Sequence, residues 1–184
     1  MKEEIRKKYL NLRSQMSKEE QEKKSQLIYE KIVSCEEYKN ADKVFVYIDM
    51  GSEVKTKSLI KKAWQDKKTV AVPVTRKNRV MYFIRIKDFD NLIKTKFGTE
   101  EPTGEIDEQI FPDDKTLFIV PGSVFDESKN RCGYGGGFYD TYIEKHNIKK
   151  PIGICYDFQV LKEIQTEQFD RKMFKIITEE RIIE

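Results

Sequence analysis

At positions 43–48 the chain contains Lys43-Val-Phe-Val-Tyr-Ile48, a continuous apolar run typical of a strand that is buried on both faces. A polar turn through Gly51-Ser-Glu53 follows, then a helical pattern over about residues 56–65, then a second apolar run, Thr69-Val-Ala-Val-Pro-Val74. This order predicts a βαβ unit with a right-handed crossover and both strands in a parallel region of one sheet. The fold class is therefore predicted to be α/β.

The remaining segments extend this pattern toward the C-terminus. Apolar runs predict four further strands, at residues 80–86, 116–120, 152–156 and 173–177. A helical pattern over about residues 137–146 predicts one further helix. Thr116-Leu-Phe-Ile-Val120 is the most apolar strand and is expected at the centre of the sheet. The polar stretch 87–114, which contains Pro102 and Gly104, is interpreted as connecting structure.

Two helices are predicted before the first strand. Along residues 2–16, apolar side chains recur at helical spacings of four, three and four, namely Ile5, Tyr9, Leu12 and Met16. On that helix Lys2, Arg6 and Arg13 lie within roughly 40° of one another, beside the apolar stripe. The sequence Ser17-Lys-Glu-Glu20 predicts a capping box that begins a second helix, which runs to about Cys35.

Length and charge limit the classes of function. The chain has 184 residues, of which 38% are apolar and 11% aromatic, and this is enough for one compact domain over residues 1–184. Its 35 Lys and Arg residues against 32 Asp and Glu give a net charge of only +3, which argues against a general polyanion-binding protein. We expect a monomer that acts on small molecules, with no nucleic-acid partner.

Cysteine content and hydropathy predict the compartment. Cys35, Cys132 and Cys155 are an odd number and form no zinc-like spacing with His146. No apolar run approaches the roughly 20 residues of a membrane helix, and no signal-peptide core follows the N-terminus. A reduced, cytoplasmic protein without a membrane partner is expected.

The segment from Pro121 to Asp140 has a composition that folding alone does not explain. Four of the nine glycines fall within positions 133–137, between a buried strand and a predicted helix, where backbone N–H groups can turn toward an anion. Arg131 before this loop offers a planar fork for a phosphate oxygen, and Asp140 after it offers a hard oxygen ligand for Mg²⁺. These residues together predict a site for a metal-bound nucleotide.

Two other interpretations of the sequence remain open. The P-loop motif is absent, and Gly133-x-Gly135 begins like a dinucleotide fingerprint although Phe138 occupies the position of its third glycine. Asp157, about 20 residues downstream, stands where a dinucleotide-dependent oxidoreductase would hold ribose. A nucleic-acid-binding module that uses the basic N-terminal helix is the third interpretation, and it predicts steeply salt-dependent binding.

The same segment resembles the signature of the 5-formyltetrahydrofolate cyclo-ligases, Pro-Gly-x-x-Phe-Asp followed by Gly-x-Arg-Leu-Gly-x-Gly-x-Gly-Tyr-Tyr-Asp. The likeness extends to Lys2-x-x-x-Arg6, to Ser52-Glu-Val-Lys-Thr56, to Phe169-Asp170 and to Thr178-Glu179, in the same order along nearly the whole chain. It implies an ATP-dependent closure of 5-formyltetrahydrofolate to 5,10-methenyltetrahydrofolate, with Mg²⁺ as cofactor. The implied fold is a three-layer, Rossmann-like domain with a mixed, mainly parallel sheet between helices.

The resemblance also implies a role for individual residues. Arg131, Tyr139 and Asp140 would be catalytic, and Asp140 and Asp170 would hold Mg²⁺. ATP would be bound by Lys2, Arg6, Arg131, Cys132, Gly133, Tyr134, Gly135, Gly136, Gly137, Phe138 and Tyr139. The folate substrate would be bound by Ile48, Glu53, Tyr134, Gly135, Gly136, Gly137 and Phe138.

Four residues depart from the family pattern. Lys129 replaces a glycine, Cys132 a leucine and Phe138 the first tyrosine of the signature, and Phe174 replaces an acidic residue near Asp170. A phosphate cradle built from backbone N–H groups tolerates such side-chain changes, so we expect activity to persist.

Overall fold

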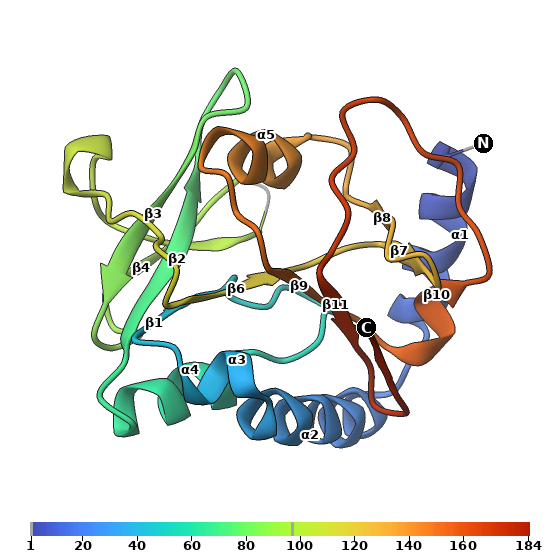
Figure 1. The fold of residues 1–184 in the computed structure, drawn as a ribbon, viewed down its shortest axis with the longest axis horizontal. Helices are drawn as coiled ribbons and strands as arrows, with labels where there is room; N and C mark the ends of the chain where they lie inside the picture. Colours follow the sequence, from blue (N-terminus) through green and yellow to red (C-terminus); the bar gives the residue numbers. More distant parts are fainter. Residues whose placement is uncertain (1, 97) are drawn as a thin grey trace.

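The computed structural model describes residues 2–96 and 98–184, and a mixed sheet forms its centre (Figure 1). Seven strands cross this sheet in the order β12 (Ile182–Ile183), β11 (Lys175–Ile177), β9 (Pro151–Ile154), β6 (Thr116–Val120), β1 (Lys43–Phe45), β2 (Thr69–Thr75) and β3 (Met81–Ile86). The pairs from β11 to β2 are parallel, and the two edge strands are antiparallel to their neighbours. The predicted mixed, mainly parallel sheet is confirmed, and β6 is its central strand.

The apolar runs supply both faces of the sheet, which is why they do not alternate with polar residues. Val44 packs in the cluster on one face and Phe45 in the cluster on the other, and neither is exposed. Strand β1 is shorter than the predicted run, because its ladder ends at Phe45. The backbone continues toward Ile48, and the Val46 N–H donates to the Ala71 carbonyl at 3.0 Å.

Helices cover the two faces in three layers, as Figure 1 shows. Helices α2 (Lys18–Ser34), α3 (Glu36–Lys39) and α4 (Lys57–Gln65) lie on one face, and α5 (Phe138–Lys145) lies on the other. Ser17 caps α2 as predicted, because its hydroxyl accepts from the Glu20 N–H at 3.1 Å. Among the described residues, no helix has the length and apolar content to cross a membrane.

Two small sheets were not predicted. One consists of β10 (Val160–Leu161), β7 (Val124–Asp126) and β8 (Arg131–Cys132), and it lies beside helix α1 (Lys2–Ser14). The other is a hairpin of β4 (Leu92–Lys94) and β5 (Glu100–Pro102), so the interpretation of residues 87–114 as connecting structure alone is wrong. Short 3₁₀ turns η1 (Ile106–Glu108) and η2 (Asp157–Gln159) complete the elements.

A buried carboxylate holds the turn between β7 and β8. Asp126 has no exposed surface, and its two oxygens accept from Asn130 N–H and Nδ2, both at 2.9 Å, and from the Ile164 N–H at 3.0 Å. Lys129 in this turn has φ 66°, a left-handed conformation that favours glycine. The glycine that the family signature has at this position would adopt the left-handed conformation without strain. Lys129 adopts the same conformation at some cost in energy.

The site lies at the end of the sheet where the parallel strands finish. Residues 49–53 follow β1, the turn 76–80 follows β2, and the segment from Pro121 through the glycine-rich loop follows β6. In open α/β sheets, ligands bind at this carboxyl end of the strands.

Candidate active site

The glycine-rich loop, residues 133–137, connects β8 to α5. Gly135 has φ +99° and Gly137 has φ +69°, conformations that residues with a side chain rarely adopt. Gly137 is the N-cap residue of α5, and no side chain caps this helix. The first N–H groups of α5 thus begin directly at the loop, where a helix attracts negative charge.

Arg6 of α1 contacts this loop, and Lys2 of the same helix contacts Asp170. The Arg6 Nε donates to the Gly133 carbonyl at 2.8 Å, and its Nη2 lies 3.8 Å from the Cys132 Sγ. Lys2 forms an ion pair with Asp170, with Nζ 2.5 Å from Oδ2. Helix α1 therefore brings Lys2 and Arg6 to the segments that contain the glycines and Asp170.

A second cluster joins Glu53 to the loop. The Tyr134 hydroxyl donates to Glu53 Oε1, and the Met50 N–H donates to Oε2 at 2.9 Å. Arg13 completes the cluster, because its Nη1 donates to the Tyr134 hydroxyl at 2.9 Å and its Nε to the Ser52 hydroxyl at 3.1 Å. Tyr134 is nonetheless 42% exposed, so a ligand can reach part of its surface.

Burial dominates the electrostatics of this cluster. The Glu53 side chain is buried, and this desolvation raises the pKa of its carboxyl group, although the donors Tyr134 and Met50 and the charge of Arg13 act in the opposite direction. Burial and the neighbouring Glu53 likewise raise the pKa of the Tyr134 hydroxyl, which stays a donor. The pair is suited to hydrogen bonding with a polar heteroaromatic ligand.

Arg131 is buried below the loop. Its Nη2 pairs with Asp140 Oδ2 at 2.7 Å and its Nη1 donates to the Pro121 carbonyl at 3.1 Å. Among the described residues, its Nε is buried with no hydrogen-bond partner. Asp140 Oδ1 accepts from the Arg171 N–H at 3.1 Å, which brings the segment of Asp170 next to Asp140. The two predicted metal ligands thus lie on adjoining segments, each already paired with a cation.

The aromatic residues after the loop pack inward. Tyr139 lies with its ring centroid 6.3 Å from that of Phe118 and 5.7 Å from the Arg131 guanidinium carbon, and burial raises the pKa of its hydroxyl. This hydroxyl is buried without a hydrogen-bond partner among the described residues. Phe138 packs against the same core cluster. An orphaned hydroxyl near Glu53 and Arg131 is a group that a bound ligand could satisfy.

Other predicted positions are less tightly joined to the loop. Ile48 is buried in the core cluster that faces α2 and α4. Asp157 Oδ1 accepts from the Thr178 hydroxyl and from Arg181 Nε, each at 2.9 Å, so one oxygen of the carboxylate that the dinucleotide interpretation assigned to ribose ties β11 to the C-terminal turn. No group of three potential ligand side chains for a metal exists within the described residues.

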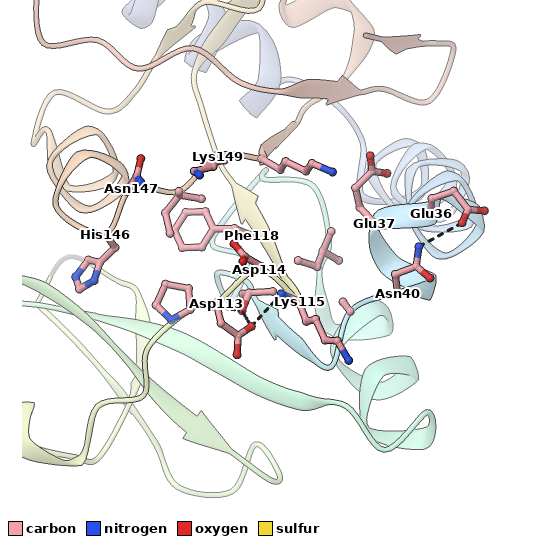
Figure 2. Close-up of a pocket in the computed structure, with 16 residues that line it drawn as sticks. Glu36, Glu37, Asn40, Asp113, Asp114, Lys115, Phe118, His146, Asn147 and Lys149 are labelled. Atoms are coloured by element: carbon pink, nitrogen blue, oxygen red, sulfur yellow. Dashed lines mark hydrogen bonds between the residues drawn. The ribbon is translucent and has the colours of Figure 1, made fainter.

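A groove of about 570 Å³ lies at the opposite end of the sheet (Figure 2). Figure 2 shows His146 and Asn147 from the end of α5, Asp113, Asp114 and Lys115 before β6, and Glu36, Glu37 and Asn40 from α3 around it. Its walls mix both signs of charge and contain no glycine-rich turn. None of the residues predicted to bind ATP or folate lines it.

Comparisons with known proteins identify the family of this chain. The model of the 5-formyltetrahydrofolate cyclo-ligase family matches residues 1–179. A protein of Schizosaccharomyces pombe named "Probable 5-formyltetrahydrofolate cyclo-ligase" is 34% identical over 85% of this chain and 84% of its own length. The chain belongs to the 5-formyltetrahydrofolate cyclo-ligase family.

One solved structure and a further relative by sequence also match this chain. The NMR structure of the 5,10-methenyltetrahydrofolate synthetase of Aquifex aeolicus matches with a TM-score of 0.84 and 28% identity, over 98% of this chain and 91% of that one. The 5-formyltetrahydrofolate cyclo-ligase of Haemophilus influenzae is 26% identical over 95% of this chain and 96% of its own. Membership of this family confirms the predicted enzyme class, a ligase of folate one-carbon metabolism.

Sequence reasoning missed the role of Arg13. It placed Arg13 on the same helix face as Lys2 and Arg6 but assigned it no contact. In the structure its side chain is buried and supports Tyr134 and Ser52. The signal was present in the helical spacing, since a third cation on the face that reaches the site is expected to reach it as well.

Proposed function

We propose that this chain catalyses the ATP- and Mg²⁺-dependent cyclisation of 5-formyltetrahydrofolate to 5,10-methenyltetrahydrofolate, with ADP and phosphate as the other products. One observation carries the proposal beyond family membership. The glycine-rich loop contacts Arg6 at Gly133 and Glu53 at Tyr134, so that one short segment joins a phosphate-binding arrangement to a buried carboxylate. A reaction between a nucleotide and a heteroaromatic substrate needs both at one place.

The nucleotide half of the site would use backbone and cations. The N–H groups of residues 133–137 and of the start of α5 would donate hydrogen bonds to the phosphate oxygens, and Lys2 and Arg6 would neutralise the phosphate charge. Cys132, Phe138 and Tyr139 border this loop and would contact ATP at its edges. Because Arg131 is buried and paired with Asp140, it would act from beneath the loop, with its unpartnered Nε as the group still free to donate.

The residues present fit Mg²⁺, which usually takes one or two carboxylates and completes its shell with phosphate oxygens and water. Asp140 and Asp170 are 17% and 20% exposed at the side chain and lie on segments joined by the Arg171 N–H. These two would hold the ion, and Lys2 would move from its present ion pair with Asp170 toward phosphate. The ion would supply neutralisation of phosphate charge during transfer.

The folate half would be organised by Glu53. Its carboxylate can accept hydrogen bonds from the donor-rich edge of a pterin, and the exposed side of Tyr134 and the ring of Phe138 offer faces for stacking. Ile48 would form an apolar wall. The loop residues Gly135, Gly136 and Gly137 would lie between the two substrates and contact both.

The chemistry then requires little covalent help from the chain. The N5-formyl oxygen attacks the γ-phosphorus of ATP and ADP leaves, which gives an imino-phosphate. N10 attacks the activated formyl carbon, the phosphate leaves with its oxygen, and N10 loses its proton. The residues named above hold the two substrates in line, exclude water and stabilise the charge that develops on phosphate.

The test is the absorbance of methenyltetrahydrofolate formed from 5-formyltetrahydrofolate, ATP and Mg²⁺, with ATP omitted as a control. Arg6→Gln is expected to raise the KM for ATP about tenfold, since it removes a charge-assisted contact. Lys7→Gln on the exposed side of the same helix changes net charge equally and should leave KM unchanged. A folded protein that forms no product with ATP would contradict the proposed reaction.

Three properties of the whole protein are proposed on the same basis. We expect residues 1–184 to act as one domain, as a monomer and in the cytoplasm. Gel filtration of the purified chain and its localisation in cells test the last two.

A further inference from the structure

The turn between β2 and β3 lies at the same end of the sheet as the glycine-rich loop. It consists of residues 76–80, and the Arg76 N–H closes it by donating to the Val80 carbonyl at 2.9 Å. Asn78 and Arg79 have φ values of 61° and 59°, so both central residues are left-handed. Left-handed positions in tight hairpin turns usually hold Asn or Gly.

Arg79 occupies the position where glycine would be free of strain. Asparagine tolerates the left-handed region, whereas a long side chain such as arginine is disfavoured there. Strained positions of this kind cluster at ligand-binding sites. The strain at Arg79 is therefore a reason to examine what its side chain contacts.

The Arg79 side chain extends over Gly137. A Cβ atom built on Gly137 would lie 3.5 Å from the Arg79 Nε and 3.6 Å from its Cζ. Within residues 2–96 and 98–184, Arg79 has no hydrogen bond or ion pair, whereas Arg76 in the same turn pairs with Glu101 at 3.1 Å. The Arg79 guanidinium thus lies at the loop with its donors unused.

Arg6 occupies the equivalent place at the other left-handed glycine. A Cβ on Gly135 would lie 3.4 Å from the Arg6 Nη1. Two guanidinium groups, one from α1 and one from the β2–β3 turn, therefore border the loop at Gly135 and Gly137. A ligand that carries several negative charges suits this pair of forks at the start of α5.

We propose that Arg79 is a phosphate-binding residue, which holds an oxygen of the nucleotide's terminal phosphate over Gly137. The proposal rests on the proposed function for the identity of the nucleotide. It assigns to the β2–β3 turn a part in the ATP site that the resemblance to the family signature did not include. The strain at residue 79 is then the cost of placing a guanidinium at this point.

Arg79→Gly separates the phosphate contact of the side chain from the strain of the backbone. Glycine removes the guanidinium, and it adopts the left-handed conformation without strain. We expect calorimetric binding of a non-hydrolysable ATP analogue with Mg²⁺ to weaken about tenfold, as a lost charge-assisted contact predicts. ADP should lose much less affinity, since it lacks the terminal phosphate. The Tm of the free protein should rise. Lys77→Gln, an equal loss of charge in the same turn, should change none of these.

Three outcomes would overturn the proposal. Nucleotide affinity that is unchanged in Arg79→Gly would leave Arg79 as a surface residue only. An equal loss for ADP and the ATP analogue would exclude the terminal phosphate, and a rise in the KM for folate alone would move Arg79 to a folate carboxylate. Because binding is measured without turnover, a wild-type chain that binds nucleotide but forms no methenyltetrahydrofolate contradicts the proposed function and not this assignment.

Discussion

The two ends of the sheet both carry charged residues but differ in how these are arranged. At the carboxyl end, cations lie at the glycine-rich loop: Arg6 contacts it directly and Arg13 holds Tyr134 against Glu53. At the opposite end, the groove in Figure 2 intermixes Glu36, Glu37 and Asp113 with lysines. An ordered set of cations beside a left-handed glycine turn can bind an anion, whereas intermixed charges largely neutralise one another. The size of a cavity is thus a poor guide to the site in this protein.

Among the substitutions that test this contrast between the two ends, Glu53→Gln is expected to lower activity most. Glu53→Gln keeps the shape of the side chain but removes the charge that a pterin edge would meet. We predict a loss of about 100-fold in kcat/KM for folate, since a buried charge-assisted hydrogen bond contributes roughly 1.5–3 kcal/mol. The KM for ATP should change little. The measurement is initial rate of methenyltetrahydrofolate formation at varied folate.

The matched control is Glu37→Gln at the opposite end. Glu37 accepts from Lys175 at 3.2 Å, and Lys175 retains Glu184 at 2.8 Å when Glu37 is neutral. Activity of this variant should stay within about twofold of wild type, because Glu37 lines the groove at the end of the sheet opposite the glycine-rich loop. Equal losses in the two variants would show that the two ends are not functionally distinct.

Arg13→Met is expected to have the next largest effect. The change removes the donors to Ser52 and Tyr134 but keeps apolar packing for the helix. We predict about tenfold lower kcat/KM for folate and a loss of about 1–3 kcal/mol in the free energy of unfolding, because buried hydrogen-bond acceptors are left unpaired. Urea denaturation and steady-state kinetics measure the two effects. Unchanged kinetics with lower stability would reduce Arg13 to a structural role.

Much of the fold could be predicted because it depends on local patterns. The runs beginning at Lys43, Thr69 and Thr116 are apolar on both faces, and this required a sheet covered by helices on both sides. The β7–β8 ladder could not be predicted, because it depends on the buried Asp126 accepting from Asn130 and from the distant Ile164. Such long-range hydrogen bonds leave no periodic trace in sequence.

The candidate site was predicted in parts for the same reason. The glycines of 133–137 and the cations of α1 are visible in composition and spacing. The contact of Arg13 with Tyr134 and the position of Arg79 over Gly137 required the packing of segments far apart in the chain. A left-handed arginine in a turn cannot be distinguished from an ordinary surface arginine by sequence alone.

The pH dependence of kcat/KM for folate provides a further comparison of Glu53 with a carboxylate at the opposite end of the sheet. Burial raises the pKa of the Glu53 carboxyl, so the folded protein holds this proton more tightly than the unfolded chain does. Its contribution to stability is present at acid pH and is lost as pH rises through the raised pKa. The expected catalytic effect has the opposite sign, because the proposed contact of Glu53 with the pterin needs the ionised carboxylate. We predict that kcat/KM for folate falls on acidification through a pKa above the ordinary range of glutamate.

The control for this profile is Glu53→Gln, in which the acid limb assigned to Glu53 should be absent. By contrast, Glu37 has a pKa lowered by its own backbone N–H and by Lys175, against the opposing effect of burial, and would titrate below this range. An acid limb that persists unchanged in Glu53→Gln would assign it to another group.

The smallest change in the KM for ATP is expected for Lys149→Gln. Its matched variant at the carboxyl end of the sheet is Lys2→Gln. Both changes remove one positive charge, Lys149 from the exposed rim of the groove and Lys2 from its ion pair with Asp170. Lys2→Gln should raise the KM for ATP about tenfold, since it removes a charge-assisted phosphate contact, whereas Lys149→Gln should leave it within about twofold. If net charge alone steered ATP to the protein, both variants would weaken binding equally, and raising the salt concentration would abolish the difference between them. A difference that persists at high salt would instead show that ATP recognition depends on the arrangement of cations at the carboxyl end of the sheet.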